Sequence, residues 1–292
     1  MRTPPRIDWV PLWLMAPAGL LLGVLMLYPI LRGVVMSFFN TRLLRFDQGR
    51  FIGLGNYEDL LADPDFWNSL HVTLLYAIGT VAFTYVVGLS LALLLDRKLP
   101  GRGVLRTLFV LPWAIPEIVI VLIFVWMLDA QYGVINYALV ELTIFERPQA
   151  WLSDSRLALI AVIMVTVWQQ FPLAMLILLA GLQTIPAEQY EAAMVDGAGA
   201  LQRLRHVTIP GLRAINVILV LILVLNSFRR VTILYAMTGG GPARATETLS
   251  VLTYTTAFQY QKIGYASAIG TILLLLLLGF SLVWSRSTKQ PD

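Results

Sequence analysis

The chain has 292 residues, of which 58% are hydrophobic and only 13% are charged, whereas roughly a quarter of the residues of a soluble globular protein are charged. It contains no cysteine and only two histidines, His71 and His206, which excludes disulfides, thiolate metal sites, cysteine nucleophiles and histidine-rich metal sites. The net charge is +4, and the basic residues lie in short runs beside apolar segments instead of on a separate basic face or arm. This pattern is typical of residues that set the orientation of membrane helices, and it does not indicate nucleic-acid binding.

Several stretches stay apolar for about twenty residues, the length that a helix needs to cross the roughly 30 Å hydrocarbon core of a membrane. The strands of a membrane β-barrel would be shorter and would alternate polar with apolar residues. The sequence therefore predicts an all-α polytopic membrane protein with six transmembrane helices. We expect these spans at residues 12–36, 70–95, 105–128, 157–181, 214–235 and 264–284.

The first apolar stretch follows Arg2 and Arg6 and could be mistaken for a signal peptide. It is too long for a secretory apolar region, and no small-residue cleavage site follows it. We therefore expect residues 1–36 to form an amino-terminal tail and a retained first transmembrane helix that packs peripherally. An extracytoplasmic segment is predicted at residues 37–69.

The other spans define a five-helix transport core at residues 70–285, which contains a cytoplasmic loop at 182–211 and is followed by a cytoplasmic tail at 286–292. Lys and Arg residues are densest in the short segment between Asp96 and Arg106. Because basic residues favour the cytoplasmic side of a membrane, we expect both termini to be cytoplasmic.

The third and fourth spans carry prolines and polar residues. Pro112 and Pro116 predict a kink in the third span. Glu117 in that span, and Gln169 and Gln170 in the fourth, are expected near the bilayer midplane, where polar side chains are costly and mark pathways by default. A structural ion pair is an equally acceptable interpretation of Glu117, and hydrogen bonding between helices is the alternative for the glutamines.

The loop after the fourth span is too polar to cross a membrane. Its residues Tyr190, Met194, Gly197, Leu201 and Leu204 recur at helical spacing, which predicts one face of a short amphipathic helix or helix pair. Acidic Glu188 and Glu191 fall in its first turns, where the helix dipole favours them. A glycine at 197 allows a sharp turn or the close approach of another backbone. Such a segment is suited to docking in a groove of a partner.

The fifth span carries a further polar group, and a glycine-rich turn follows it. Asn226, Phe228 and Arg229 are candidates for the substrate pathway, and Arg230 is a further polar residue of this span; structural roles are the same alternatives as above. The run from Gly239 to Pro242 lacks the lysine and hydroxyl of a phosphate-binding loop. We expect it to be a flexible external turn or docking loop.

Several motifs resemble the permeases of binding-protein-dependent ATP-binding-cassette importers. The cytoplasmic coupling loop of that family is similar to Glu191-Ala192-Ala193, Asp196-Gly197-Ala198, Leu204, Ile209 and Pro210. Its sugar branch, which includes the maltose and glycerol-phosphate permeases, is similar in Leu54-Gly55-Asn56-Tyr57, Leu111-Pro112 with Pro116, Thr238-Gly239-Gly240-Gly241-Pro242 and Ala245-Thr246-Glu247-Thr248-Leu249. The chain departs from the family at Leu204, where an aromatic residue is frequent, and at Ala214, where proline is frequent. The first departure should weaken one packing contact.

The resemblance implies a type I importer fold and a division of labour among subunits. A second homologous permease would complete the pathway, two cytoplasmic ATPase subunits would bind the coupling helices of the two permeases, and an extracytoplasmic substrate-binding protein would deliver the cargo. This chain lacks the phosphate loop of an ATPase and is not expected to be an enzyme or to hold a cofactor, so ATP and Mg²⁺ would bind to the partner subunits. The expected location, among membrane lipid, is the cytoplasmic (inner) membrane of a bacterium or archaeon.

The favoured cargo is a sugar, a di- or oligosaccharide, and three other interpretations remain open. A charged solute such as a glycerol phosphate would suit Arg229 and Arg230. An intramembrane enzyme would need a nucleophile, metal ligands or a pair of carboxylates within the membrane, where the sequence offers only Glu117. A passive channel would not need a cytoplasmic docking helix.

Overall fold

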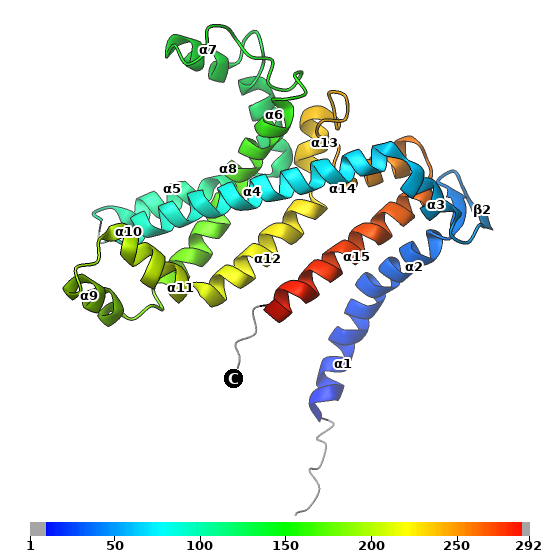
Figure 1. Cartoon of the computed structure of the whole chain (residues 1–292). Coiled ribbons are helices and arrows are strands. Elements are labelled where there is room, and N and C mark those ends of the chain that lie inside the picture. The colour runs from blue at the N-terminus through cyan, green and yellow to red at the C-terminus, as the bar shows by residue number, and fades with distance from the viewer. Residues whose placement is uncertain (1–9, 98, 288–292) are drawn as a thin grey trace, which may run out of the picture. The chain divides into compact units, whose positions relative to one another are not determined.

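The computed structural model describes residues 10–97 and 99–287, which are predominantly helical (Figure 1). These residues form two compact units. The first unit contains the described residues up to Asp63 together with Thr253–Ile272, and the second contains Pro64–Leu252 together with the described residues from Leu273 onward. The long helix α15 (Ile263–Ser287) belongs partly to each unit.

The first unit begins with a helical stretch whose apolar side chains are exposed. It comprises α1 (Val10–Leu22), the π-helical turn η1 (Gly23–Leu27) and α2 (Tyr28–Met36). In the candidate span Leu14–Met36, 0% of the most apolar window is buried. Such a surface suits lipid or another subunit, because water would not solvate it favourably.

A hairpin and a short helix follow in the same unit. The antiparallel strands β1 (Phe39–Arg42) and β2 (Arg45–Phe51) pair Phe39 with Phe51, and they precede α3 (Gly55–Ala62). The buried amide of Asn56 donates to the carbonyl oxygens of Ser37 at 2.7 Å and Phe39 at 3.0 Å. The Leu54-Gly55-Asn56-Tyr57 motif therefore has a structural role, since Asn56 attaches α3 to Ser37 before the hairpin and to Phe39 at its first position. The unit also contains η3 (Thr255–Gln259).

The second unit is built on α4 (Pro64–Asp96) and α8 (Ala158–Leu182), which pack against each other. Small residues of α4 allow the close approach, as is usual between membrane helices. A Cβ atom added at Gly88 would lie 2.8 Å from the Cβ of Ala174, and one at Gly79 would lie 2.9 Å from Cδ1 of Ile163. Because both contacts advance along the two helices in the same direction, α4 and α8 are parallel.

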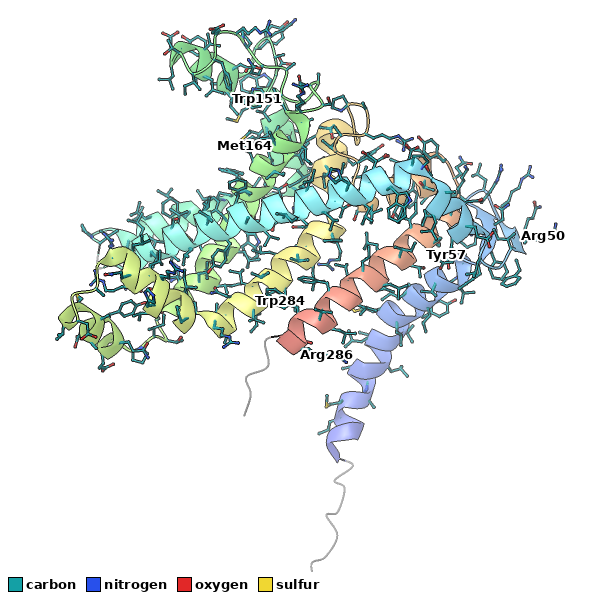
Figure 2. The ribbon with its side chains drawn as sticks, viewed as in Figure 1. Arg50, Tyr57, Trp151, Met164, Trp284 and Arg286 are labelled. Carbon is teal, nitrogen blue, oxygen red and sulfur yellow. The ribbon has the colours of Figure 1, made fainter. Side chains whose placement is uncertain are left out.

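Other helices surround this pair within the second unit (Figure 1). Most of the α8 window, 67%, is buried, compared with 33% for α4, so α8 lies at the centre of the unit. The side chain of Trp284 in α15 is labelled in Figure 2. Its indole N–H donates to the carbonyl oxygen of Val217 at 2.9 Å. The remaining helices of the membrane part are α5 (Arg102–Ala114), α6 (Glu117–Met127), α12 (Arg213–Arg229), α13 (Thr232–Thr238) and α14 (Leu249–Tyr254).

Two loops of the second unit contain short helices. The loop before α8 holds α7 (Val134–Glu141), where the buried side chain of Asn136 accepts a hydrogen bond from the indole N–H of Trp151 at 2.9 Å. The loop after α8 holds α9 (Ala187–Val195), α10 (Ala200–Arg203), η2 (Leu204–Thr208) and α11 (Ile209–Gly211).

The helices confirm the all-α fold but correct two of the predicted spans. Four described helices are long and apolar enough to cross a membrane, or up to six if two bent helix pairs are each counted as one span. The predicted third span breaks at Ile115-Pro116, where α5 and α6 differ in direction by 94°. Ile115 is extended, with φ −79° and ψ 133°, because the proline ring disfavours helical backbone in the preceding residue. The second bent pair joins residues 200–211 to the helix Arg213–Arg229 at 75°. The predicted fifth span has a separate break at Arg230, which is also extended with ψ 120°.

Candidate functional site

The two helix breaks are joined by an ion pair between Glu117 and Arg230. Glu117 is the first residue of α6, and Arg230 follows the last residue of α12. Arg230 Nη1 donates to Glu117 Oε1. The Arg230 side chain is 9% exposed and that of Glu117 is 34% exposed, so the arginine is the more deeply buried partner. The ion pair thus links the third and fifth predicted spans where their helices change direction.

Gln170 of α8 completes the set of partners around Arg230. With its amide oxygen facing the guanidinium, Gln170 accepts from Arg230 Nη2 at 2.7 Å and from Nε at 3.2 Å. Each of the three guanidinium nitrogens therefore has an acceptor. We call Glu117, Arg230 and Gln170 the clasp. A buried cation with complete partners is stabilised, whereas one with a missing partner would be strongly destabilising. Glu117 thus forms the ion pair that was one interpretation of this residue, with Arg230 as its partner, and it also lines a cavity, which was the other interpretation.

Arg229 is partnered differently from its neighbour. It is exposed, and it donates from Nε to the carbonyl oxygen of Leu225 at 3.3 Å and from Nη2 to Asn226 Oδ1 at 3.1 Å. In the part of the chain that the structure describes, no carboxylate forms an ion pair with it. The positive charge of Arg229, beside the clasp, is therefore not balanced by a carboxylate of the described residues.

A cavity of about 320 Å³ lies at this position. It brings together three of the residues that the sequence analysis selected, Glu117, Asn226 and Arg229, and adds Arg230, Val231 and Thr232. Arg230 lies in the same predicted span as Asn226 and Arg229 but is not among the predicted substrate residues. Val231 and Thr232 were missed, because they resemble ordinary span residues until the helix break turns them towards the cavity.

The other selected residues of the spans lie outside this cavity. Phe228 is buried in a small apolar cluster with Ala77 and Leu277, so it contributes to packing. Gln169 is 7% exposed, and its Oε1 atom has no hydrogen-bond partner among the described residues. A buried amide oxygen without a partner is unfavourable by about 1–3 kcal/mol, which marks Gln169 as a group able to accept a further hydrogen bond.

The predicted coupling loop forms a separate polar region. Helix α9 begins after Pro186 with Glu188 in its first turn, and it ends in a turn at Gly197, whose φ is +80°. Ala198 N–H donates to the carbonyl oxygen of Ala193 at 2.8 Å, the bond that closes a glycine-terminated helix. No atom lies within 4 Å of a Cβ added at Gly197. Gly197 thus forms the predicted bend, and the surface over it is open.

Hollows and exposed apolar side chains surround this bend. One hollow of about 320 Å³ is lined by Ala193, Asp196, Gly197, Ala198, Gln202, Arg203, His206 and Val207. A second of about 430 Å³ lies against Tyr190 and Leu204, and the Tyr190 hydroxyl is hydrogen-bonded to Thr208 Oγ1 at 3.1 Å. Met194, Val195 and Leu201 are 51%, 88% and 76% exposed. The segment also contains Glu191, Ala192 and Pro210 at its outer face or ends, and it presents a mixed apolar and polar surface.

The glycine-rich turn after α13, which we expect to be a flexible external turn or a docking loop, is bonded to its neighbours. Thr238 Oγ1 lies 2.6 Å from Thr246 Oγ1. Arg244 forms ion pairs with Asp65 at 2.9 Å and with Glu247 at 3.0 Å. These bonds attach the turn to the start of α4 within the second unit.

Comparisons with known proteins agree with this arrangement. Residues 84–287 match the family described as binding-protein-dependent transport system inner membrane component. The chain belongs to this family. It is 36% identical over 279 residues to the trehalose/maltose transport system permease protein MalF of Thermococcus litoralis, covering 91% of this chain and 92% of that protein. It is 34% identical over 279 residues to the sulfoquinovosyl glycerol transport system permease protein SmoG of Agrobacterium fabrum, covering 96% and 90%.

A solved structure supports the fold of this transport component. A chain of a bacterial ABC transporter involved in the import of the acidic polysaccharide alginate superposes with a TM-score of 0.80 at 20% identity, over 96% of this chain and 95% of that one. Family and fold together confirm the resemblance deduced from the coupling-loop motif. The protein is a permease of a transport system, with the type I importer fold.

Proposed function

We propose that this permease is one subunit of an ATP-driven sugar importer and forms half of its translocation pathway. The observation that carries the proposal is the α9–α11 segment, which presents exposed apolar residues around the open bend at Gly197. A segment of this kind matches what two cytoplasmic ATPase subunits would need in order to grip the membrane helices. Glu188, Tyr190, Glu191, Ala192, Ala193, Asp196, Gly197, Ala198, Leu204 and Pro210 are the proposed coupling residues.

The sugar class is supported by the names of the relatives. MalF is described as a trehalose and maltose permease and SmoG as a sulfoquinovosyl glycerol permease, and both are similar to this chain over nearly its whole length. A second permease subunit would complete the pathway, and an extracytoplasmic binding protein would deliver the sugar. ATP and Mg²⁺ would bind to the ATPase subunits, and this chain would supply no catalytic group.

The mechanism follows from the breaks in the helices. ATP binding would close the ATPase subunits, move α9, and shift α12, which follows the coupling segment directly. Because α12 ends at the clasp, its displacement reaches α6 and α8 through Glu117 and Gln170. Alternating access would then consist of helix movements on either side of the clasp.

Reconstitution tests this function. The complete transporter, purified through a tag on this chain, should contain an ATPase pair and a second permease, and in vesicles with its binding protein it should accumulate an oligosaccharide only when ATP is supplied. Uptake without ATP would indicate a passive channel. The absence of any ATPase in the purified assembly would contradict the proposal, as would chemical conversion of the sugar by this chain.

We also propose a cytoplasmic-membrane location with both termini cytoplasmic, which the cysteine-free sequence makes testable. A cysteine introduced at Ala243 should react with an impermeant thiol reagent added outside, and one at Arg102 should react only after the membrane is opened. The opposite pattern would reverse the orientation.

A further inference from the structure

Two consecutive arginines at the end of α12 have different partners. Arg230 is almost buried and all its nitrogens face acceptors from the clasp. Arg229 is exposed and bonds only to an amide oxygen and a backbone carbonyl. One carboxylate, that of Glu117, therefore faces two guanidinium groups around the cavity. The cavity carries a surplus of positive charge from Arg229.

The ends of the helices do not remove this surplus. The carboxyl end of α12, at Arg229, contributes partial negative charge, and the amino end of α6, at Glu117, contributes partial positive charge of similar size. These two contributions oppose each other across the same cavity. The full charge of the Arg229 guanidinium remains.

The unused hydrogen-bonding groups point to the same type of ligand. A guanidinium has several N–H donors and no acceptor, and Arg229 engages only Nε and Nη2 with residues that the structure describes. The side-chain nitrogen of Asn226 also lacks an acceptor among those residues, because its bond to Arg229 uses the oxygen. The free groups of Arg229 and Asn226 are thus donors, whereas the side-chain acceptors at the cavity are the carboxylate of Glu117, which already pairs with Arg230, and the hydroxyl of Thr232. A neutral hydroxyl both donates and accepts, whereas a carboxylate, sulfonate or phosphate only accepts and brings the missing negative charge.

We propose that Arg229 and Asn226 bind an acidic group of the transported sugar, so that the cargo is a sugar carrying a carboxylate, sulfonate or phosphate. This inference rests on the proposed function as a sugar importer. A volume of about 320 Å³ lies within the range of small-molecule sites, so there is room for a charged group together with part of its sugar ring. Charged side chains within a membrane protein are paired or line a water-filled path; Arg229 is exposed at the cavity, and an acidic cargo would pair with it during passage.

The charge can be measured because the chain has no cysteine of its own. Thr232 is exposed and lines the cavity, so Thr232→Cys places a thiol there in the complete transporter, with any partner cysteines replaced. An anionic methanethiosulfonate, the ethylsulfonate, should react faster than the cationic ethyltrimethylammonium reagent. Arg229→Gln should lower the ratio of the two rates about tenfold, the scale expected for one nearby charge at intermediate dielectric.

Arg102→Gln is the matched control, since it removes an exposed arginine at the start of α5, far along the helix from the cavity. It should leave the ratio unchanged. Equal rates in the transporter without the Arg229 substitution would mean that an acidic residue of the partner permease neutralises Arg229, and this would overturn the proposal. A thiol that neither reagent reaches would overturn it too, because a substrate path must be accessible.

Protection of the same thiol separates acidic from neutral sugars. Digalacturonate, at saturating concentration with the binding protein present, should slow the labelling of Thr232→Cys at least fivefold, and this protection should disappear with Arg229→Gln. Maltose, of similar size and without charge, should protect much less. Equal protection by the two sugars would refute the acidic cargo while supporting sugar import. Absence of ATP-driven uptake of any sugar, with the charge ratio intact, would instead refute the proposed function.

Discussion

The coupling segment and the clasp are both polar regions of one membrane protein, but they are constructed in opposite ways. In the coupling segment, neighbours in sequence form the surface, and Met194, Val195 and Leu201 remain exposed. In the clasp, one residue comes from each of three distant stretches, and Arg230 and Gln170 are nearly buried. The first region is suited to contact with another protein, and the second to holding helices at a defined angle.

The two regions differ in which contacts stabilise them. A surface segment gains most of its stabilisation when a partner covers its apolar side chains. A buried ion pair within a membrane depends on the completeness of its own partners. Substitutions in the clasp should therefore lower the stability of the folded chain. Those in the coupling segment should mainly affect coupling to the ATPase subunits.

The largest effect is expected from breaking the clasp on its acidic side. Glu117→Ala leaves Arg230, 9% exposed, without its counter-charge, and should destabilise the protein by about 3–5 kcal/mol. Arg230→Ala should cost less, because the Glu117 side chain that remains is 34% exposed and water can solvate it. Thermal unfolding of the purified transporter in detergent measures both.

The double variant is the control for the clasp. Glu117→Gln combined with Arg230→Met removes both charges and should recover more than half of the lost stability. A double variant as unstable as Glu117→Ala would show that the two charges are not energetically coupled.

The next largest effect distinguishes two adjacent glutamines. Gln170→Leu removes the acceptor of two hydrogen bonds from Arg230 and should destabilise by about 1.5–3 kcal/mol, the range for hydrogen bonds to charged groups. Gln169→Leu removes an amide oxygen that has no partner among the described residues, so stability should be unchanged or slightly higher. Unfolding temperatures report the first effect.

If Gln169 lines the substrate pathway, Gln169→Leu should impair transport more than Gln170→Leu, the reverse of their order for stability. Gln169→Leu should then reduce ATP-dependent uptake severalfold in a fully assembled transporter. Full uptake by this variant would leave hydrogen bonding between helices, or simple packing, as the role of Gln169.

A smaller effect on stability, but a large one on coupling, is expected at Gly197. A side chain at its φ of +80° introduces strain of about 1–2 kcal/mol, although no atom lies within 4 Å of the added Cβ. Gly101 has a φ of +74° and equally open surroundings, so Gly101→Val is a matched control for strain. Only Gly197→Val should lower ATP-dependent uptake, to below about a tenth. Equal losses in both variants would assign the effect to strain instead of docking.

The sequence predicted the helical fold and the coupling bend well because both depend on local signals. Apolar runs define spans, and the glycine at 197 marks the end of α9 with its own conformational freedom. Pro116 likewise predicted a kink in the third span, since proline restricts the backbone of the residue before it. The break in the fifth span had no such signal, because Arg230 and Val231 are not helix breakers.

The partners within the clasp could not be predicted from the sequence. Glu117 could have paired with Arg229 or Arg230, and the choice depends on how α12 ends and how α6 turns away from α5. The same tertiary geometry placed Phe228 in an apolar cluster and Thr232 at the cavity. A helical projection extended through the fifth span would have placed these residues incorrectly, because the helix stops at Arg229.

The smallest effect concerns a single hydrogen bond inside the coupling segment. Tyr190→Phe removes the hydroxyl that lies 3.1 Å from Thr208 Oγ1, and it should destabilise the folded chain by about 1 kcal/mol. Because this bond attaches α9 to η2, its loss should also loosen the segment and lower ATPase stimulation a few-fold. Tyr85→Phe is the control, since it removes a bond of the same length, 3.1 Å to Asn216 Oδ1, in α4. It should cost similar stability and leave ATPase binding intact, so equal ATPase activity in the two variants would mean that α9 transmits force without this bond.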